Sequence, residues 1–116
     1  PQMSRIGTMS ELSVVPENAL IKIDRDYPLD RAALVGCGVT TGVGAVLKTA
    51  EVEPGSTVAV IGAGGIGLNV IQGAVIADAA KIIAVDLVER KLDYARSFGA
   101  THTVNAANTR SNRSCT

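Results

Sequence analysis

Residues 58–67 read VAVIGAGGIG, and this stretch decides how the chain folds. Its first four residues are apolar and either β-branched or small, which is typical of a short buried strand. Four of the six residues that follow are glycine. Gly62, Gly64 and Gly67 form a G-x-G-x-x-G pattern at the point where a strand ends and a helix is expected to begin.

Each glycine of this pattern has a physical reason. Gly62 allows a tight turn out of the strand, Gly64 lets a pyrophosphate approach the backbone, and Gly67 lets the helix pack closely on the strand. Gly65 adds a further unhindered backbone N–H group. The helix that begins here presents unpaired N–H groups and the positive end of its dipole, so the stretch predicts a phosphate-binding turn.

An acidic residue follows at the spacing that such a turn requires. Residues 81–86, KIIAVD, are expected to form a buried strand that ends in Asp86, about twenty residues after the glycines. We expect the Asp86 carboxylate to accept hydrogen bonds from the ribose hydroxyls of adenosine, and its charge to repel a 2′-phosphate. The pattern therefore favours NAD over NADP. The alternative is a glycine-rich turn without a ligand, followed by an aspartate that merely ends a strand.

The segment 56–105 alternates regularly between strand-like and helical patterns. Strands that alternate with helices predict a β-α-β-α-β unit with a parallel sheet, right-handed crossovers and an α/β fold class. Expected strands lie at 57–62, 81–86 and 101–105, and expected helices at 65–78 and 88–100. The residues expected to face the core are Ile66, Val70, Ile71, Ala74, Ala77, Leu92, Ala95 and Phe98, with Gly99 ending the second helix.

The two ends of the chain have different patterns. SELSVVPE at 10–17 and ALIKID at 19–24 contain alternating or β-branched apolar residues, which predicts two strands of a β-rich region. The tail at 106–116, AANTRSNRSCT, is polar and has no periodicity. We therefore expect this tail to be disordered.

Two helices are expected between these strands and the glycine motif. Asp30 is expected to cap a short helix that begins at Arg31. The GCG triplet at 36–38 is expected to break this helix, and a second helical stretch is expected over 39–49. The dipeptide Pro-Gly at 54–55 then predicts a turn before the glycine-motif strand.

The composition argues against several functions. The formal net charge is zero, so no general field attracts nucleic acid or an anionic membrane. Aromatic residues make up only 3% of the chain, which leaves little for base stacking. No run reads as a membrane span, and the first residues lack the apolar centre of a secretory signal. We expect a cytoplasmic protein whose two cysteines, Cys37 and Cys115, are reduced.

Three stretches resemble a known family. They are GTMSELSVVPENALIKID at 7–24, GCGVTTGVGAVLKTAEVEPGSTVAVIGAGGIGLNVIQGA at 36–74, and KIIAVDLVERKLDYARSFGATHTVN at 81–105. The sequence is similar to the zinc-dependent medium-chain alcohol dehydrogenases, a group that includes glutathione-dependent formaldehyde dehydrogenases. GCGVTTG followed at this distance by VIGAGGIG is highly specific to that family.

The resemblance implies a partial Rossmann fold preceded by a β-rich remnant of a catalytic domain. Residues 1–36 correspond to the C-terminal part of the GroES-like catalytic domain and 37–55 to a connecting helical region. Residues 56–105 correspond to the first half of the NAD-binding Rossmann domain, and 106–116 form the expected tail. The other zinc ligands and the second half of the dinucleotide fold have no counterpart here, so we expect a fragment of the parent protein.

The resemblance also implies roles for individual residues. Cys37 matches the cysteine ligand of the catalytic zinc, which needs two further protein ligands. Thr41 matches a threonine near the nicotinamide ring, and Ile66 matches a branched residue behind that ring. Asp86 matches the ribose-binding acid, and Lys91 matches a basic residue that contacts the same ribose. The plainer alternatives are a small buried thiol, ordinary helix residues and a core isoleucine.

The implied activity is hydride transfer between a primary alcohol, or a hydroxymethyl-thiol adduct, and NAD at a catalytic zinc. The parent protein is expected to be a homo-oligomer that acts on small alcohols or aldehydes. The one histidine, His102, falls in a strand where the family has no zinc ligand. This chain alone is expected to have negligible turnover. The alternatives are a stand-alone module that binds NAD or an adenine nucleotide without chemistry, and a non-functional remnant.

Overall fold

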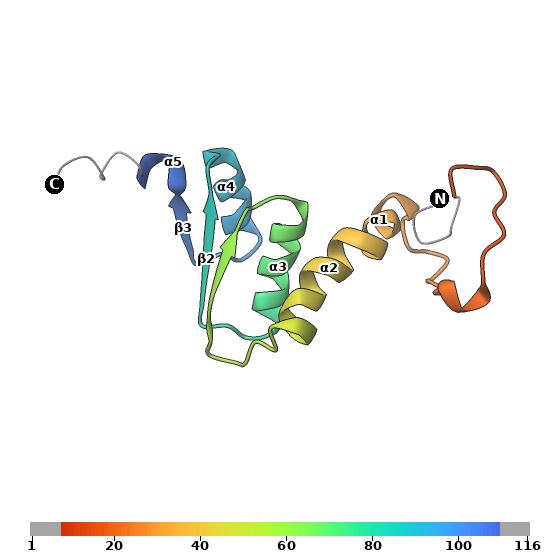
Figure 1. The fold of residues 1–116 in the computed structure, drawn as a ribbon, viewed down its shortest axis with the longest axis horizontal. Coiled ribbons are helices and arrows are strands. Elements are labelled where there is room, and N and C mark those ends of the chain that lie inside the picture. Colours follow the sequence, from red (N-terminus) through yellow and green to blue (C-terminus); the bar gives the residue numbers. More distant parts are fainter. Residues whose placement is uncertain (1–7, 110–116) are drawn as a thin grey trace.

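The computed structural model describes residues 8–109 and builds them around a parallel three-stranded sheet (Figure 1). Ile61 lies beside Val85 in the first strand pair, and Asp86 lies beside Asn105 in the second. The α/β class and the three strands predicted from the sequence are confirmed. The strands are β1 (Thr57–Ile61), β2 (Lys81–Asp86) and β3 (His102–Asn105), in the order β1-β2-β3.

Two helices connect these strands. Helix α3 (Gly65–Ile76) links β1 to β2, and helix α4 (Glu89–Ser97) links β2 to β3. Both crossovers advance in the same direction across the sheet, and the buried side chains of the two helices join one core cluster. Asp78 and Gly99 follow the helices with φ values of 56° and 112°, so left-handed residues end both, as the sequence predicts for Gly99.

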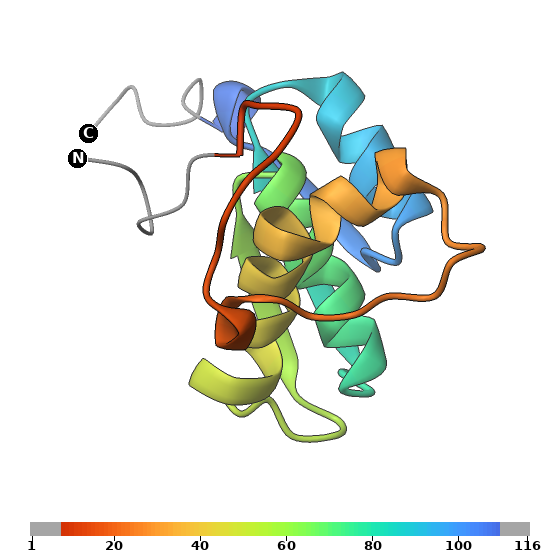
Figure 2. The same ribbon diagram turned by 90° about the vertical axis from the view of Figure 1, so that its right-hand side faces the viewer.

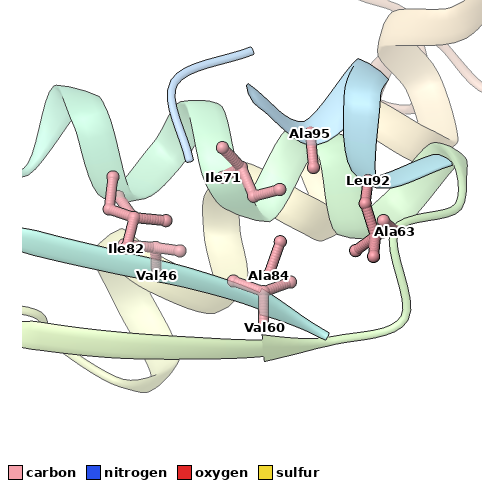
Figure 3. Close-up of a cluster of buried hydrophobic side chains, with 9 residues drawn as sticks. Val46, Val60, Ala63, Ile71, Ile82, Ala84, Leu92 and Ala95 are labelled. Atoms are coloured by element: carbon pink, nitrogen blue, oxygen red, sulfur yellow. The ribbon is translucent and has the colours of Figure 1, made fainter. Parts of the chain in front are cut away.

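The core lies between the helices and the sheet (Figure 3). It contains Ile71 from α3, Leu92 from α4 and Ile82 from β2, which are the largest fully buried side chains among the described residues. Burying each contributes roughly 1.5–3 kcal/mol relative to leaving it exposed. The buried hydrophobic residues of the described chain are Val46, Val60, Ala63, Ile71, Ala74, Ile82, Ala84, Leu92 and Ala95.

Two residues expected in the core lie largely outside it. Ile66 is 49% exposed because it occupies the first turn of α3 and lines an open cleft. Phe98 is 38% exposed because it is the C-cap of α4, after the last turn that faces the sheet. The helical periodicity is therefore correct over the middle of each helix and wrong at these two ends.

One continuous helical run covers Leu29–Thr49, where two separate helices were expected. The GCG triplet does not break the run, because its glycines lie in a π-helical turn that keeps the chain helical. The successive parts are α1 (Leu29–Leu34), the π-helical turn η3 (Val35–Val39), α2 (Thr40–Gly44) and the π-helical turn η4 (Ala45–Thr49).

The start of this run also differs from the expectation. Pro28 is the N-cap residue, and no side chain makes a capping hydrogen bond. Asp30 lies inside the first turn, so its predicted role as the cap is wrong. A proline at this point removes a backbone N–H and fixes φ at −59°, which lets the helix begin two residues earlier than predicted. Asp30 still places a negative charge near the positive end of the helix dipole.

The run Leu29–Thr49 is long and apolar enough to cross a membrane, by length and composition only, with a mean hydropathy of 1.4. By this measure it differs from the expectation that no run reads as a membrane span. A mostly buried core helix or a signal sequence passes the same test of length and composition, and only 11% of this stretch is buried within the described residues. Part of this run packs on α3 through the buried Gly42. Figure 2 shows α2 lying beside α3.

The two strands predicted before the helices are absent from residues 8–28. This segment contains one short 3₁₀ helix, η2 (Glu17–Ala19), and no ladder pairing. Val14 and Ile21 are 104% and 90% exposed, so the apolar side chains on which the prediction rested have no sheet to face. A strand is stable only when a neighbour satisfies its backbone groups, and the described chain provides none here.

The last described residues correct the prediction of a disordered tail. A single helical turn, α5 (Ala106–Thr109), follows β3. Asn105 Oδ1 accepts a hydrogen bond from the Ala107 N–H at 3.0 Å, which caps this turn. Residues 110–116, including Cys115, lie outside the described chain, so the prediction for them stays a prediction.

The position of the core predicts an asymmetric response along α3. Ile71→Ala should lower the free energy of unfolding by about 2–5 kcal/mol, because the side chain is fully buried and its loss leaves a cavity. Ile76→Ala is the matched control, since Ile76 is 66% exposed and its loss should change stability by about 0.5 kcal/mol or less. Urea denaturation of the two variants measures the difference, and equal losses would contradict this assignment of the core.

Candidate functional site

The glycine motif forms a tight connection between the carboxyl end of β1 and α3. Gly62 has φ of 96°, a left-handed conformation that favours glycine, and its N–H donates to the Val85 carbonyl at 2.8 Å. A Cβ atom at Gly67 would collide with the Gly62 carbonyl oxygen. The first turn of α3 therefore lies directly against the end of β1, which supports the turn and packing roles expected of these two glycines.

The other two glycines of the motif border open space. A Cβ atom at Gly64 or Gly65 would meet no protein atom within 4 Å. Within the described chain, the backbone N–H groups of 64–67 have no protein acceptor. The hydrogen bonds of the helix begin with the Leu68 N–H, which donates to the Gly64 carbonyl. These N–H groups and the helix dipole make this end of α3 suited to a phosphate.

Asp86 ends β2 and directs its carboxylate to the glycine motif. Oδ2 accepts a hydrogen bond from the Ala63 N–H at 2.9 Å, and Oδ1 accepts one from the Val88 N–H at 3.0 Å. Lys91 Nζ lies 3.8 Å from Oδ2. Only 9% of the Asp86 side chain is exposed, so the carboxylate is held in one orientation.

These contacts lower the pKa of Asp86 below the usual aspartate value. The Val88 N–H has the largest effect and the Ala63 N–H the next, because both stabilise the carboxylate anion. Partial burial raises the pKa, and the nearby Lys91 ammonium lowers it by a smaller amount. Asp86 is therefore ionised at neutral pH, as an acceptor for sugar hydroxyls must be.

The glycine motif and Asp86 border one cleft of about 590 Å³. A second cavity of about 430 Å³ adjoins it, and Gly62, Asp86 and Lys91 line both. The Asp86 carboxylate thus lies between the cleft and the second cavity, beside the N-terminal end of α3. The residues that line the larger cleft are Ala59, Val60, Ile61, Gly62, Gly64, Gly65, Ile66, Gly67, Val70, Asp86 and Lys91.

The structure brings together seven of the nine residues singled out from the sequence. The four glycines of the motif, Ile66, Asp86 and Lys91 all line the larger cleft. Thr41 and Cys37 do not line it, and both are exposed on the helical run that packs against α3. The cleft therefore contains the predicted contacts for phosphate and ribose together with Ile66, one of the three residues assigned to the reacting end, whereas Thr41 and Cys37 lie apart from it.

The described residues do not by themselves form a zinc site. Within 8–109, no group of three or more His, Cys, Asp or Glu side chains is close enough to hold a metal ion. Cys37 is an exposed free thiol. His102 lies in β3, where its Nδ1 is 2.9 Å from Thr101 Oγ1. A catalytic zinc requires three protein ligands, so Cys37 can contribute at most one of them.

Two residues of the site were missed from the sequence. Ala63 is buried and its N–H holds the Asp86 carboxylate, a backbone role that no side-chain signal identifies. Val70 lines the cleft one turn after Ile66, and the sequence assigned it to the core. Its position on the same helical face as Ile66 is the signal that could have found it.

The family model described as zinc-binding dehydrogenase matches residues 65–114. S-(hydroxymethyl)glutathione dehydrogenase of Saccharomyces cerevisiae is 55% identical over 99 residues, which are 85% of this chain and 26% of the relative. Alcohol dehydrogenase B of Mycobacterium tuberculosis is 49% identical over 108 residues, which are 90% of this chain and 29% of the relative. This chain therefore spans between a quarter and a third of the length of these relatives.

Solved structures have the same fold. Benzyl alcohol dehydrogenase from Acinetobacter calcoaceticus superimposes with a TM-score of 0.79 at 38% identity. An alcohol dehydrogenase zinc-binding domain protein from Burkholderia ambifaria superimposes with a TM-score of 0.78 at 41% identity. Each match covers 82% of this chain and 26% of the other chain.

The Asp86 contacts predict a particular pH dependence of stability. Because its pKa is lower in the folded than in the unfolded chain, the ionised carboxylate stabilises the fold above the usual aspartate range. That stability is lost as the pH falls through the folded-state pKa. Asp86→Asn should therefore lower the urea midpoint at neutral pH, and the gap to the wild type should narrow below a pH of about 4.

Asp93→Asn is the control, because it removes the same charge from a side chain that is 64% exposed and pairs with Arg96 at the surface. We expect it to change the midpoint little at any pH, since exposed ion pairs contribute little to stability. Denaturation curves from neutral to acidic pH give both comparisons. A midpoint for Asp86→Asn equal to that of Asp93→Asn throughout would show that the buried carboxylate does not support the fold.

Proposed function

Because this chain belongs to the zinc-dependent medium-chain alcohol dehydrogenase family, we propose that it forms the part of an NAD-dependent oxidoreductase that holds the adenosine and pyrophosphate of the cofactor. The observation that supports this most directly is the placement of Asp86 beside the unpartnered N–H groups of residues 64–67. The N–H groups attract a negatively charged phosphate, whereas the Asp86 carboxylate accepts hydrogen bonds from hydroxyl groups. A dinucleotide presents both of these chemical groups in sequence.

The cofactor pyrophosphate is proposed to lie against the start of α3. The open space at Gly64 and Gly65 is where a phosphate can approach the backbone without meeting a side chain. Each N–H group there can donate to a phosphate oxygen, and hydrogen bonds to an anion are the stronger kind. Water is displaced from these N–H groups when the phosphate binds, so no buried donor is left without an acceptor.

The adenosine ribose is proposed to lie beside Asp86 and Lys91. The carboxylate already accepts from two backbone N–H groups and keeps acceptor capacity for the ribose hydroxyls. Its negative charge repels a 2′-phosphate, which favours NAD over NADP. The Lys91 ammonium, 3.8 Å from the carboxylate, is half exposed and can donate to the same sugar.

The remaining assignments concern the nicotinamide end. Ile66 lines the cleft and is proposed to lie behind the nicotinamide ring, with Thr41 near the same ring. Cys37 is proposed to be one ligand of a catalytic zinc whose other ligands belong to the longer polypeptide. The described residues do not complete a zinc site, because no group of three or more His, Cys, Asp or Glu side chains among them could hold a metal ion.

For the whole protein we propose oxidation of a primary alcohol, or of a hydroxymethyl-thiol adduct, with hydride transfer to NAD. Two of the relatives are named alcohol dehydrogenase and S-(hydroxymethyl)glutathione dehydrogenase, which supports this substrate class. NAD supplies the hydride acceptor when it is bound. The chain itself contributes binding and orientation of the cofactor, and its own turnover is expected to be negligible. The cytoplasmic location and the homo-oligomeric state stay predictions.

Gly64→Ala tests the proposed phosphate position. Gly64 has φ of −86° and ψ of −168°, which alanine adopts without strain, and the new methyl group meets no protein atom. The variant should therefore keep the wild-type urea midpoint while its NAD affinity falls by about tenfold or more, as the methyl group occupies the phosphate space. Titration followed by NMR measures the affinity, and Gly36→Ala is the control because its methyl group also meets open space.

The titration also decides between the functions considered. Wild-type binding of NAD, with weaker binding of NADP and loss in Gly64→Ala, supports the proposal. Wild-type binding of NAD that is unchanged in Gly64→Ala would place the phosphate elsewhere. A folded wild-type chain that binds neither NAD nor AMP would overturn the nucleotide-binding role.

The zinc assignment is tested in the longer polypeptide that contains this segment. Cys37→Ala should remove most of the catalytic zinc measured by elemental analysis, because a tetrahedral site that loses a thiolate loses one of three protein ligands. Cys115→Ala is the control for loss of a thiol and should retain the metal. Equal zinc contents in the two variants would exclude Cys37 as a ligand, and the chain would then serve as a nucleotide-binding module.

A further inference from the structure

Gly42 lies where α2 crosses α3, and the crossing leaves no room for a side chain. A Cβ atom at Gly42 would lie 2.5 Å from Asn69 Cβ, 2.7 Å from the Ile66 carbonyl oxygen and 2.8 Å from the Val70 nitrogen. Two of these three atoms belong to the backbone of α3. They cannot rotate away as the end of a flexible side chain can, so a methyl group at Gly42 has to move one helix relative to the other.

The neighbouring glycines of the same helical run do not share this constraint. A Cβ atom at Gly36 or Gly44 would meet no atom within 4 Å, and one at Gly38 would make an ordinary contact of 3.8 Å with Asn69 Nδ2. Glycine in a helix interior lowers helix stability by about 1 kcal/mol relative to alanine. At these three positions no neighbouring atom excludes a side chain that would avoid this loss. At Gly42 the missing side chain permits backbone contact between two helices.

Two of the three residues that face Gly42 line the proposed nucleotide site, and the third is hydrogen-bonded to its first helical turn. Ile66 and Val70 both line the cleft. Asn69 Nδ2 donates a hydrogen bond to the Gly65 carbonyl at 2.8 Å, so this side chain is tied to the first turn of α3. A shift at Gly42 therefore reaches the turn whose N–H groups face the cleft, through the Ile66 carbonyl and through Asn69.

We propose that Gly42 is a positioning residue for the nucleotide site, acting through Ile66 and Asn69. Its missing side chain sets how closely α2 approaches α3, and thereby the direction of the N–H groups at 64–67. It also sets the distance from the cleft to Thr41, which precedes it in the same helix. The inference rests on the proposed function, because it concerns how the NAD phosphates are held.

Gly42→Ala tests this inference in the 116-residue chain. We expect the amide signals of residues 64–67 to shift in NMR spectra of the free chain, and NAD affinity to fall by about tenfold. Gly44→Ala adds the same methyl group one half-turn away and should change neither quantity, since its Cβ meets open space.

A second control separates positioning from loss of stability. Val46 is buried and packs against Gly73, far along α3 from the glycine motif, so Val46→Ala should lower stability and leave the amides of 64–67 and the NAD affinity unchanged. If Gly42→Ala does not fold, Asn69→Ala tests the connection from α2 through Asn69 to the first turn of α3 without adding side-chain volume. It removes the hydrogen bond to the Gly65 carbonyl and should shift the Gly65 amide and weaken NAD binding.

Two results would overturn the positioning role. One is a folded Gly42→Ala chain with wild-type amide signals and NAD affinity, or an Asn69→Ala chain with both unchanged. The other is a loss of affinity in Val46→Ala as large as that in Gly42→Ala. If the proposed function is wrong, the wild-type chain itself does not bind NAD. The amide signals of 64–67 in the free Gly42→Ala chain then still show whether Gly42 positions the glycine loop.

Discussion

The close approach of Gly67 to the Gly62 carbonyl is the contact on which the site depends. It brings the first turn of α3 directly against the end of β1, and a side chain on Gly67 would prevent it. Because the turn between them is so short, the N–H groups at 64–67 emerge at the carboxyl edge of the sheet. Ligands of open α/β sheets bind at this edge, so one backbone contact decides where the phosphate-binding groups of the chain are presented.

Asp86 connects this turn to the rest of the sheet. Its carboxylate accepts from Ala63 in the glycine loop and from Val88 at the start of α4, so two crossover connections share one acidic group. The same contacts that orient the carboxylate lower its pKa and keep it ionised. A side chain that is fixed before the ligand arrives loses little conformational entropy on binding. The fixed orientation and the negative charge of Asp86 therefore both favour the proposed contact with the ribose.

The exposed apolar surface fits a chain that spans between a quarter and a third of the length of its relatives. Parallel sheets are normally covered on both faces, yet Ile61 at the end of β1 is 87% exposed and Val104 in β3 is 40% exposed. Ile21 and Leu29, before and within the long helical run, are exposed as well. The glycine motif and Asp86 border a formed cleft in the described residues, whereas these apolar side chains stay exposed.

The sequence alone determined the β-α-β-α-β segment, its strand order along the chain and the glycine motif with Asp86, because these features depend on local periodicity and spacing. The other features depend on contacts between distant parts of the chain. The strands expected at 10–17 and 19–24 have no partner in the described chain, and the helix expected to break at GCG continues through a π-helical turn. The contact of Ala63 with Asp86, and that of Gly42 with α3, join residues 23 or more positions apart, a distance that no local pattern encodes.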